Sequence, residues 1–282
     1  MKTSRRVLAL VLSCFIGVIA LPAAEFALRD GDTVVFLGDS ITAARRYDRV
    51  IENYTLLRFP ERKVRFINAG KGGDTMAGGL ARLDRDVFAR GATVLFVAFG
   101  FNDIGWGVYA DQKHKQTYLD SLRSIVERCR ERQVRVFICS AAITSTEPDK
   151  AEQEFFQKMC DEGLALAQNS GAGTVDVQRG MREIQRRVLA FNRSLKTEKG
   201  RETLHAADGV HLNELGHQAM AFTILKGIGA PADFPPQAWT PTRASSCPPS
   251  DVPLRTYGAP TTPWNLTGST KAGRSISGRL AR

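Results

Sequence analysis

Four short segments of this chain contain the residue types that acyl transfer requires. They are Gly-Asp-Ser at residues 38–40, Gly-Gly-Asp at 72–74, Gly-Phe-Asn-Asp at 100–103 and Asp-Gly-Val-His at 208–211. A serine hydroxyl becomes a nucleophile when a neighbouring base accepts its proton, and histidine is the side chain that titrates near neutral pH. The four segments together therefore indicate nucleophilic catalysis on an acyl group.

Ser40 is the expected nucleophile of this chemistry, and His211 is its expected base. Asp208 lies three residues before His211, where it can accept the imidazole Nδ1–H and leave Nε2 facing the serine. Acyl transfer also needs N–H donors for the negative charge that forms on the carbonyl oxygen. The candidates are the backbone N–H groups of Ser40 and Gly73, because no side chain blocks a glycine-rich turn, and the amide of Asn102.

Each of these residues also has a purely structural interpretation. Ser40 can cap the following helix, Gly73 can serve only a tight turn, and Asn102 can bond to its own backbone. Asp208 and His211 can be ordinary surface residues. The catalytic interpretation is favoured because the four segments occur together, three of them directly after predicted strands and one before the last predicted helix.

Several other polar and aromatic residues near the segments are not assigned a catalytic role. Asp39 and Asp103 are expected to tie loops together through hydrogen bonds. His205 and His217 are expected at the surface or in packing. Trp106 follows the third segment closely, and the sequence leaves open whether it lines a substrate pocket or simply packs.

Alternating strands and helices position the four segments. Short β-branched apolar runs predict buried strands at residues 33–37, 64–67, 93–98, 134–139 and 174–177. Longer amphipathic stretches predict helices at 47–58, 114–132, 150–169, 182–195 and 213–226, the last with Asn213 as its cap. This alternation predicts a parallel sheet covered by helices on both faces. The three segments that follow strands then meet at one rim, where such sheets bind ligands.

The segments resemble the motif blocks of the SGNH (or GDSL) hydrolase family, which includes esterases, lipases, thioesterases and carbohydrate deacetylases. Residues 38–42 resemble the nucleophile block, 68–75 the glycine block, 100–103 the Gly-x-Asn-Asp block and 208–211 the Asp-x-x-His block. The resemblance runs from about residue 33 to 227 and departs at Gly72, where many members carry serine. It implies a flavodoxin-like, three-layer α/β/α sandwich with a central parallel sheet of about five strands.

The resemblance also implies an esterase that works through an acyl-serine intermediate, with no cofactor and no metal. Ser40, Asp208 and His211 match the family's catalytic residues, and Ser40, Gly73 and Asn102 match its oxyanion hole. Short acyl esters of carbohydrate, acetyl esters in particular, are the expected substrates. Three alternatives stay open: a lysophospholipase or thioesterase with the same site, a non-catalytic binding module, and acyl transfer to a sugar hydroxyl.

Both ends of the chain differ from the predicted hydrolase domain at residues 25–230. Residues 1–24 start with three basic side chains, continue through an apolar run of about 15 residues and end in small residues, as secretory signal peptides do. A retained anchor is the alternative, although the run is shorter than the roughly 20 residues that span a bilayer. We expect export to the periplasm or the cell exterior, without stable membrane insertion after cleavage. Residues 231–282, rich in Pro, Ser, Thr and Arg, predict a disordered tail.

Charge and cysteine content exclude other classes. The net charge is +10, of which residues 1–24 carry +3 and residues 231–282 carry +4, leaving +3 for the domain. A nucleic-acid-binding protein concentrates positive charge on a folded face, so no such partner is expected. Cys129, Cys139, Cys160 and Cys247 lack the close spacing of a zinc site. Cys139, in a predicted strand, is expected to be a buried free thiol, and a disulfide between two of the others stays open.

Overall fold

Five parallel strands form one sheet at the centre of the molecule. The computed structural model describes residues 25–144, 146–151 and 154–232, so the predicted signal peptide (1–24) and residues 233–282 of the predicted tail lie outside the described residues. The strands are β1 (Thr33–Gly38), β2 (Arg65–Gly70), β3 (Val94–Ala98), β4 (Arg135–Cys139) and β5 (Gly173–Val175). They pair in the order β2-β1-β3-β4-β5. The predicted parallel sheet is confirmed.

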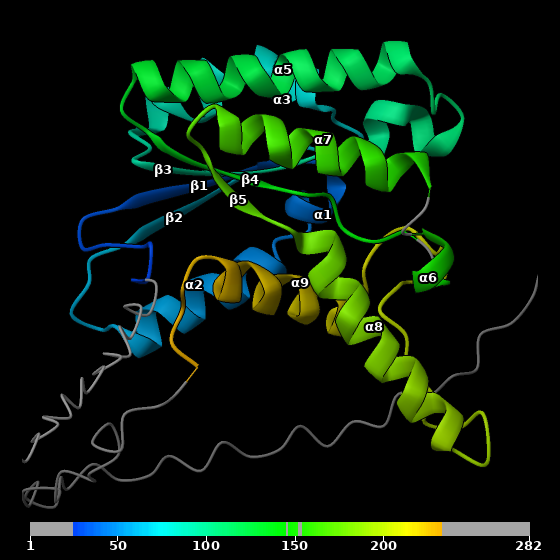
Figure 1. Cartoon of the computed structure of the whole chain (residues 1–282). Coiled ribbons are helices and arrows are strands. Elements are labelled where there is room, and N and C mark those ends of the chain that lie inside the picture. Colours follow the sequence, from blue (N-terminus) through cyan, green and yellow to red (C-terminus); the bar gives the residue numbers. More distant parts are fainter. Residues whose placement is uncertain (1–24, 145, 152–153, 233–282) are drawn as a thin grey trace, which may run out of the picture. The chain divides into compact units, whose positions relative to one another are not determined.

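Helices cover both faces of this sheet (Figure 1). One face carries α3 (Met76–Ala81), α5 (Gln112–Glu131) and α7 (Phe155–Asn169). The other carries α2 (Tyr47–Arg58), α8 (Val177–Ser194) and α9 (Glu214–Gly227). Shorter elements connect them: α1 (Ser40–Ala43), α4 (Leu83–Asp86), η1 (Phe88–Arg90), η2 (Asn102–Gly107) and α6 (Pro148–Ala151). The three-layer α/β/α sandwich is therefore confirmed.

Neighbouring residues of each strand pack into two separate apolar layers. In β1, Val34 and Phe36 join the layer under α2 and α9, whereas Val35 and Leu37 join the layer under α5 and α7. Successive side chains of a strand point to opposite faces, so a strand covered on both faces must be apolar throughout. This double burial explains why the central strands are continuous apolar runs in the sequence.

Several predicted boundaries differ from the observed ones, and a side-chain contact explains the first. The strand predicted at 174–177 ends at Val175, because Asp176 caps α8 by accepting the Arg179 N–H at 3.0 Å. Val177 therefore belongs to α8, which begins before its predicted start at residue 182. The helix predicted at 150–169 is divided between α6 and α7. The helix predicted at 47–58 coincides with α2.

The strand order reverses beside β1, since β2 and β3 flank it on opposite sides. In doubly wound sheets this reversal opens a crevice at the carboxyl ends of the strands. Gly38 ends β1 at this crevice, and a Cβ there would lie 2.1 Å from Thr42 Oγ1 and 2.8 Å from the Ala98 oxygen. Only glycine therefore lets the chain turn from β1 into α1 so close to β3.

Three cysteines of the described residues, Cys129, Cys139 and Cys160, are buried free thiols. Burial raises the pKa of each to about 12, so they stay protonated and unreactive at neutral pH. The expectation for Cys139 is confirmed, and Cys247 lies outside the described residues.

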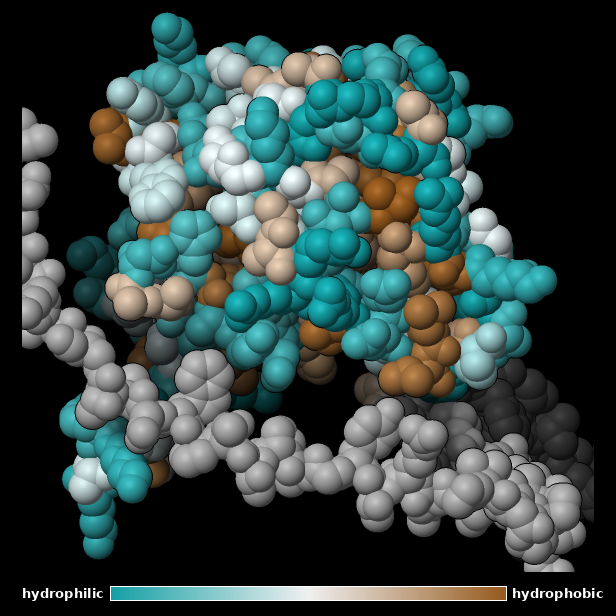
Figure 2. Space-filling model, turned by 180° about the vertical axis from the view of Figure 1, so that it is seen from behind, coloured by the Kyte–Doolittle hydropathy of each residue, from teal (hydrophilic) through white to brown (hydrophobic). Residues whose placement is uncertain are grey.

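The outer surface of the described residues is largely hydrophilic on the face shown in Figure 2, where apolar residues occupy small areas between polar ones. Scattered exposed apolar residues of this kind are ordinary for a folded protein. Among residues 25–144, 146–151 and 154–232, no helix combines the length and apolarity needed to cross a bilayer.

Candidate active site

Ser40, His211 and Asp208 form a hydrogen-bonded series at the carboxyl end of β1. Ser40 is the first residue of α1, and its Oγ lies 2.9 Å from His211 Nε2 across 171 positions of sequence. His211 Nδ1 lies 2.6 Å from Asp208 Oδ2. The imidazole therefore lies between a hydroxyl and a carboxylate, the order that serine nucleophiles require.

A tight loop before α9 holds the carboxylate of Asp208 in place. Asp208 Oδ1 accepts the backbone N–H groups of Val210 and His211 at 3.0 and 2.9 Å. The hydrogen bond from the His211 ring, together with these two backbone bonds, lowers the pKa of Asp208 to about 2. The ionised carboxylate accepts the Nδ1–H, which leaves Nε2 of the neutral ring able to accept the proton of Ser40.

Asp39, and not Ser40, caps the helix that follows β1. The Asp39 Oδ1 accepts the Ile41 N–H at 2.9 Å. The hydroxyl of Ser40 bonds instead to His211. The backbone N–H of Ser40 occupies the first helix position, where it has no acceptor within the helix. It is therefore a donor that a ligand can use.

Gly73 and Asn102 lie in the turns that follow β2 and β3. Gly73 has a φ of +70°, which glycine adopts without strain. Asn102 Nδ2 donates to the Asp74 carbonyl oxygen at 3.0 Å, so Asn102 is tied to the residue after Gly73. The same nitrogen carries a second N–H. Ser40 and Asn102 line one pocket, and Gly73 is absent from the described residues that line it.

Trp106 fixes the orientation of the Asn102 amide. Its Nε1 donates to Asn102 Oδ1 at 2.8 Å, so Nδ2 is the atom that faces Asp74. The backbone of Trp106 has a φ of +59°, which is uncommon for a residue with a side chain. Trp106 is 51% exposed as a residue, and its ring lies edge-on to that of His211 at a centroid distance of 6.1 Å. Of the two alternatives left open by the sequence, Trp106 therefore lines the pocket.

Two buried carboxyl groups lie beneath the site. Asp103 Oδ1 accepts the Met76 N–H at 2.9 Å, which joins the start of α3 to η2. Burial raises the pKa of Asp103 to about 7 and that of Asp39 to about 6. Both residues tie loops through hydrogen bonds, as expected from the sequence.

Two cavities of different size lie at the site, and Ser40 lines the smaller one. The narrow one has a volume of about 20 Å³, room for about one water-sized group, and Ala98, Ala141 and Met220 are among the residues that line it. The wide one is an open cleft of about 620 Å³. Both are lined in part by Phe101, Trp106, Thr144 and Val210. The site therefore combines a confined space with an open one across a shared wall.

Spacing alone does not distinguish His211 from two other histidines. Glu202 and Glu214 stand three residues before His205 and His217, the same spacing as in the 208–211 segment. His205 and His217 are nevertheless buried, and burial lowers the pKa of His217 to about 4. They are packing residues. Within the part of the chain that the structure describes, no group of three or more His, Cys, Asp or Glu side chains could hold a metal ion.

Sequence patterns did not single out Arg82, although the structure buries it behind the turns that carry Ser40 and Gly73, called the donor turns below. Its Nε donates to Asp74 Oδ2 at 2.7 Å. The one signal available was a cation within the small and apolar run at residues 76–83. A cation in such a run is also typical of an exposed helix face, so the contact follows only from the structure.

Comparisons with known proteins identify related chains and a family. The GDSL-like Lipase/Acylhydrolase family matches residues 36–219, a range that contains all four segments. An acetylxylan esterase of Geobacillus stearothermophilus is 26% identical over 224 residues, which cover 71% of this chain and 94% of that protein. The solved structure of an acetylxylan esterase from that organism has a TM-score of 0.58 at 22% identity and covers 72% of this chain and 96% of its own.

A gut microbial diltiazem-metabolizing enzyme of known structure has a TM-score of 0.63 and 26% identity over 73% of this chain. The present chain spans about half of that enzyme, 48% of its length. The family match covers more than half of the chain, and the fold is the one that the solved relatives share. The chain therefore belongs to the GDSL-like lipase/acylhydrolase family and is a hydrolase that acts on ester bonds.

Proposed function

We propose that this esterase removes short acyl groups, acetyl in particular, from carbohydrate through an acyl-serine intermediate. The proposal rests first on the Ser40 Oγ to His211 Nε2 distance of 2.9 Å, with Asp208 bonded to the opposite ring nitrogen. A serine so placed can lose its proton as it attacks a carbonyl carbon. No cofactor is needed for this chemistry.

In the proposed mechanism, Ser40 Oγ attacks the ester carbonyl and His211 Nε2 accepts the serine proton. Asp208 orients the ring and stabilises the imidazolium that forms. The N–H groups of Ser40 and Gly73 and the amide of Asn102 hold the negative charge on the carbonyl oxygen. His211 then protonates the leaving alcohol. Water attacks the acyl-enzyme with His211 again as the base, which releases the acid and restores the serine.

The two cavities support a small acyl group and a large alcohol. A space of about 20 Å³ accommodates a methyl group and opposes longer chains. The open cleft, with the half-exposed ring of Trp106 on its wall, suits a flat sugar face. The likeness to an acetylxylan esterase supports the same substrate class.

The N-terminal segment supports a location outside the cytoplasm. Residues 1–24 have the charge and apolar pattern of a cleaved signal peptide. N-terminal sequencing of protein recovered from the periplasm or the medium is expected to begin at Glu25. Recovery of the intact chain from the cytoplasm alone would contradict export without affecting the proposed chemistry.

The first test is hydrolysis of p-nitrophenyl esters of increasing chain length by wild type, Ser40→Ala and Ser194→Ala. Ser194 is an exposed serine at the end of α8, so its variant is the matched control. We expect the acetate to react fastest, Ser40→Ala to lose activity and Ser194→Ala to keep it. Equal activity of Ser40→Ala and wild type would exclude Ser40 as the nucleophile.

Other outcomes of the same experiment separate the alternatives. Preference for long acyl chains would favour a lysophospholipase or thioesterase. Failure of the folded wild type to cleave any ester, acetylated xylan included, would favour a binding module. Transfer of the acetyl group to an added sugar, detected by product analysis, would identify an acyltransferase.

A further inference from the structure

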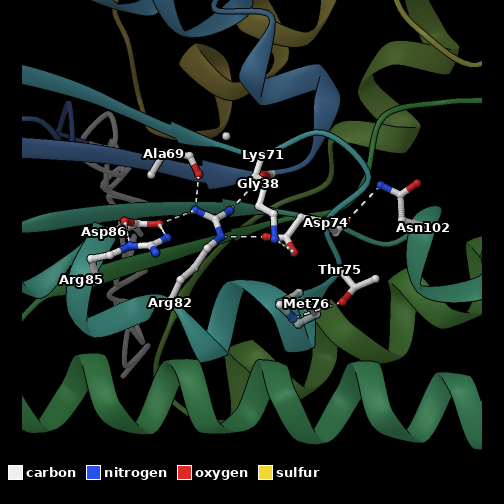
Figure 3. Close-up of polar contacts among 12 residues, drawn as sticks. Gly38, Ala69, Lys71, Asp74, Thr75, Met76, Arg82, Arg85, Asp86 and Asn102 are labelled. Carbon is white, nitrogen blue, oxygen red and sulfur yellow. Dashed lines mark hydrogen bonds and ion pairs between the residues drawn. The ribbon is translucent and has the colours of Figure 1, made fainter.

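Arg82 joins the separate turns of the active site through one buried guanidinium group (Figure 3). Its Nε donates to Asp74 Oδ2 at 2.7 Å, and its Nη2 donates to the Gly38 carbonyl at 3.1 Å. Its Nη1 donates to the Ala69 carbonyl at 2.7 Å and to Asp86 Oδ2 at 3.0 Å. The exposed fractions of the Arg82 and Asp74 side chains are only 8% and 5%. All three guanidinium nitrogens are thus used.

Two partners of Arg82, Gly38 and Asp74, stand close in sequence to proposed oxyanion donors. Gly38 ends β1 two residues before Ser40. Asp74 directly follows Gly73, and its carbonyl oxygen accepts the Asn102 amide at 3.0 Å. The guanidinium group therefore bonds directly to the segments that carry Ser40 and Gly73, and it is linked to Asn102 through Asp74.

Charge neutralisation alone does not account for this arrangement. Arg82 contacts two carboxylates, those of Asp74 and Asp86, and each has a second cation nearby. Lys71 Nζ lies 3.7 Å from Asp74, and Arg85 Nε lies 2.7 Å from Asp86. A buried ion pair is also weak grounds for expecting added stability, because desolvation offsets the attraction. What only arginine supplies here is a rigid planar set of donors that point in several directions.

We propose that Arg82 is a positioning residue that holds the oxyanion donors of Ser40, Gly73 and Asn102 in fixed positions relative to one another. This inference rests on the proposed function, since it concerns the donors of that mechanism. Donors that are already aligned stabilise a developing charge without reorganisation. A displacement of about 1 Å at such a site can cost about 10²-fold in rate. Loss of the planar guanidinium donors should therefore slow the chemical step more than it weakens substrate binding.

The test compares Arg82→Lys with Arg85→Lys in the full chain. Arg82→Lys keeps the charge but loses the planar fork, whereas Arg85 is exposed, also bonds Asp86 and contacts none of the donor turns. With p-nitrophenyl acetate we expect kcat of Arg82→Lys to fall about 10- to 100-fold while KM changes less than about threefold. Arg85→Lys should keep both constants within about twofold.

A second measurement separates positioning from a general structural role. In Arg82→Ala, added millimolar guanidinium should restore part of kcat, whereas equal sodium chloride should not. If Arg82→Ala does not fold, Asp74→Asn, which weakens the strongest Arg82 bond, should still lower kcat by about 3- to 30-fold at constant KM. Both readouts concern alignment of the donors and do not require the variant to match the thermal stability of the wild type.

Two results would overturn the inference: a folded Arg82→Lys variant with kcat within about twofold of wild type, or a rise in KM that accounts for the whole loss. Failure of the proposed function gives a different result. In that case a fluorophosphonate probe does not label Ser40 in the wild type, and the wild type shows no Ser40-dependent hydrolysis.

Discussion

The two sides of the active site are built in opposite ways. On the base side, Asp208 and His211 are three residues apart in one loop, and their side chains are 43% and 38% exposed. The donor side comprises the turns with the proposed oxyanion donors and Arg82 behind them. There, Arg82 hydrogen-bonds to Gly38 across 44 positions of sequence, and Asn102 hydrogen-bonds to Asp74 across 28. Local contacts build the first side, and contacts between distant segments build the second.

Because of this difference, substitutions on the two sides should affect catalytic activity and protein stability differently. An exposed side chain can be removed without leaving a buried group unpaired, so its removal should lower the reaction rate and change the free energy of unfolding little. A buried polar side chain that loses its partner costs about 1–3 kcal/mol of stability as well. Variants of the base side should therefore lose activity at nearly constant stability, whereas variants of the donor side should lose both.

The largest effect is expected for His211→Ala. Without its base, Ser40 loses at least about 10⁴-fold in kcat/KM, while the melting temperature stays within about 2 °C of wild type. Ester hydrolysis and thermal unfolding measure the two quantities. His114→Ala, which removes a histidine with a similar ring-to-aspartate contact on α5, is the control and should remain active. A large fall in melting temperature for His211→Ala would show that the exposed base residues also contribute to stability.

If Asn102 is an oxyanion donor as proposed, Asn102→Ala should lower kcat by about 10²- to 10³-fold. It should also lower the free energy of unfolding by about 1–2 kcal/mol, because the Asp74 carbonyl and Trp106 Nε1 lose their partner. Asn192→Ala is a matched control, since Asn192 makes two side-chain hydrogen bonds to the backbone of Glu202 far from the site. If only activity changes in Asn102→Ala, the donor side is less coupled to the fold than we infer.

Trp106→Phe keeps an aromatic ring but removes the N–H that orients the Asn102 amide. We expect kcat to fall about tenfold, with little change in melting temperature because the ring is half exposed. Steady-state kinetics with p-nitrophenyl acetate and with an acetylated sugar measure the effect. An unchanged kcat would show that the contacts with Asp74 orient Asn102 sufficiently.

Asp103→Asn should change the pH dependence of stability. Burial raises the pKa of Asp103 from its ordinary 3.8 to about 7, so between these values the folded protein holds a proton that the unfolded chain has lost. Its favourable contribution is therefore present at low pH and is lost as pH rises through 7, by up to about 1.4 kcal/mol per pH unit.

Denaturant unfolding of wild type and Asp103→Asn between pH 4 and 8 measures this slope. The variant cannot ionise and should show a shallower fall in stability, with the remainder due to Asp39, whose pKa is also raised, to about 6. Asp120→Asn, on the exposed face of α5, should keep the wild-type slope. Identical slopes in Asp103→Asn and wild type would contradict the buried, protonated state.

Hydrophobic patterning and turn residues were enough to predict much of this fold. Five apolar runs became five strands, and α2 appeared at its predicted residues, because burial on both faces of the sheet demands continuous apolar strands. The predicted strand end at residue 177 was wrong, since an apolar run does not reveal where a capping side chain ends a strand, here at Val175. Such a cap depends on one hydrogen bond, which composition does not indicate.

The sequence by itself determined the family, the parallel sheet and the identities of the candidate catalytic residues, because these depend on local residue types and their order. Spacing does not separate His211 from two histidines with an upstream carboxylate, and the structure supports the choice of His211 through the burial of the other two and the contact with Ser40. The structure also placed Trp106 against Asn102, and Arg82 behind the segments that end β1 and follow β2. The physical reason is that these contacts join residues far apart in the chain, and their distances follow from how the strands and helices pack.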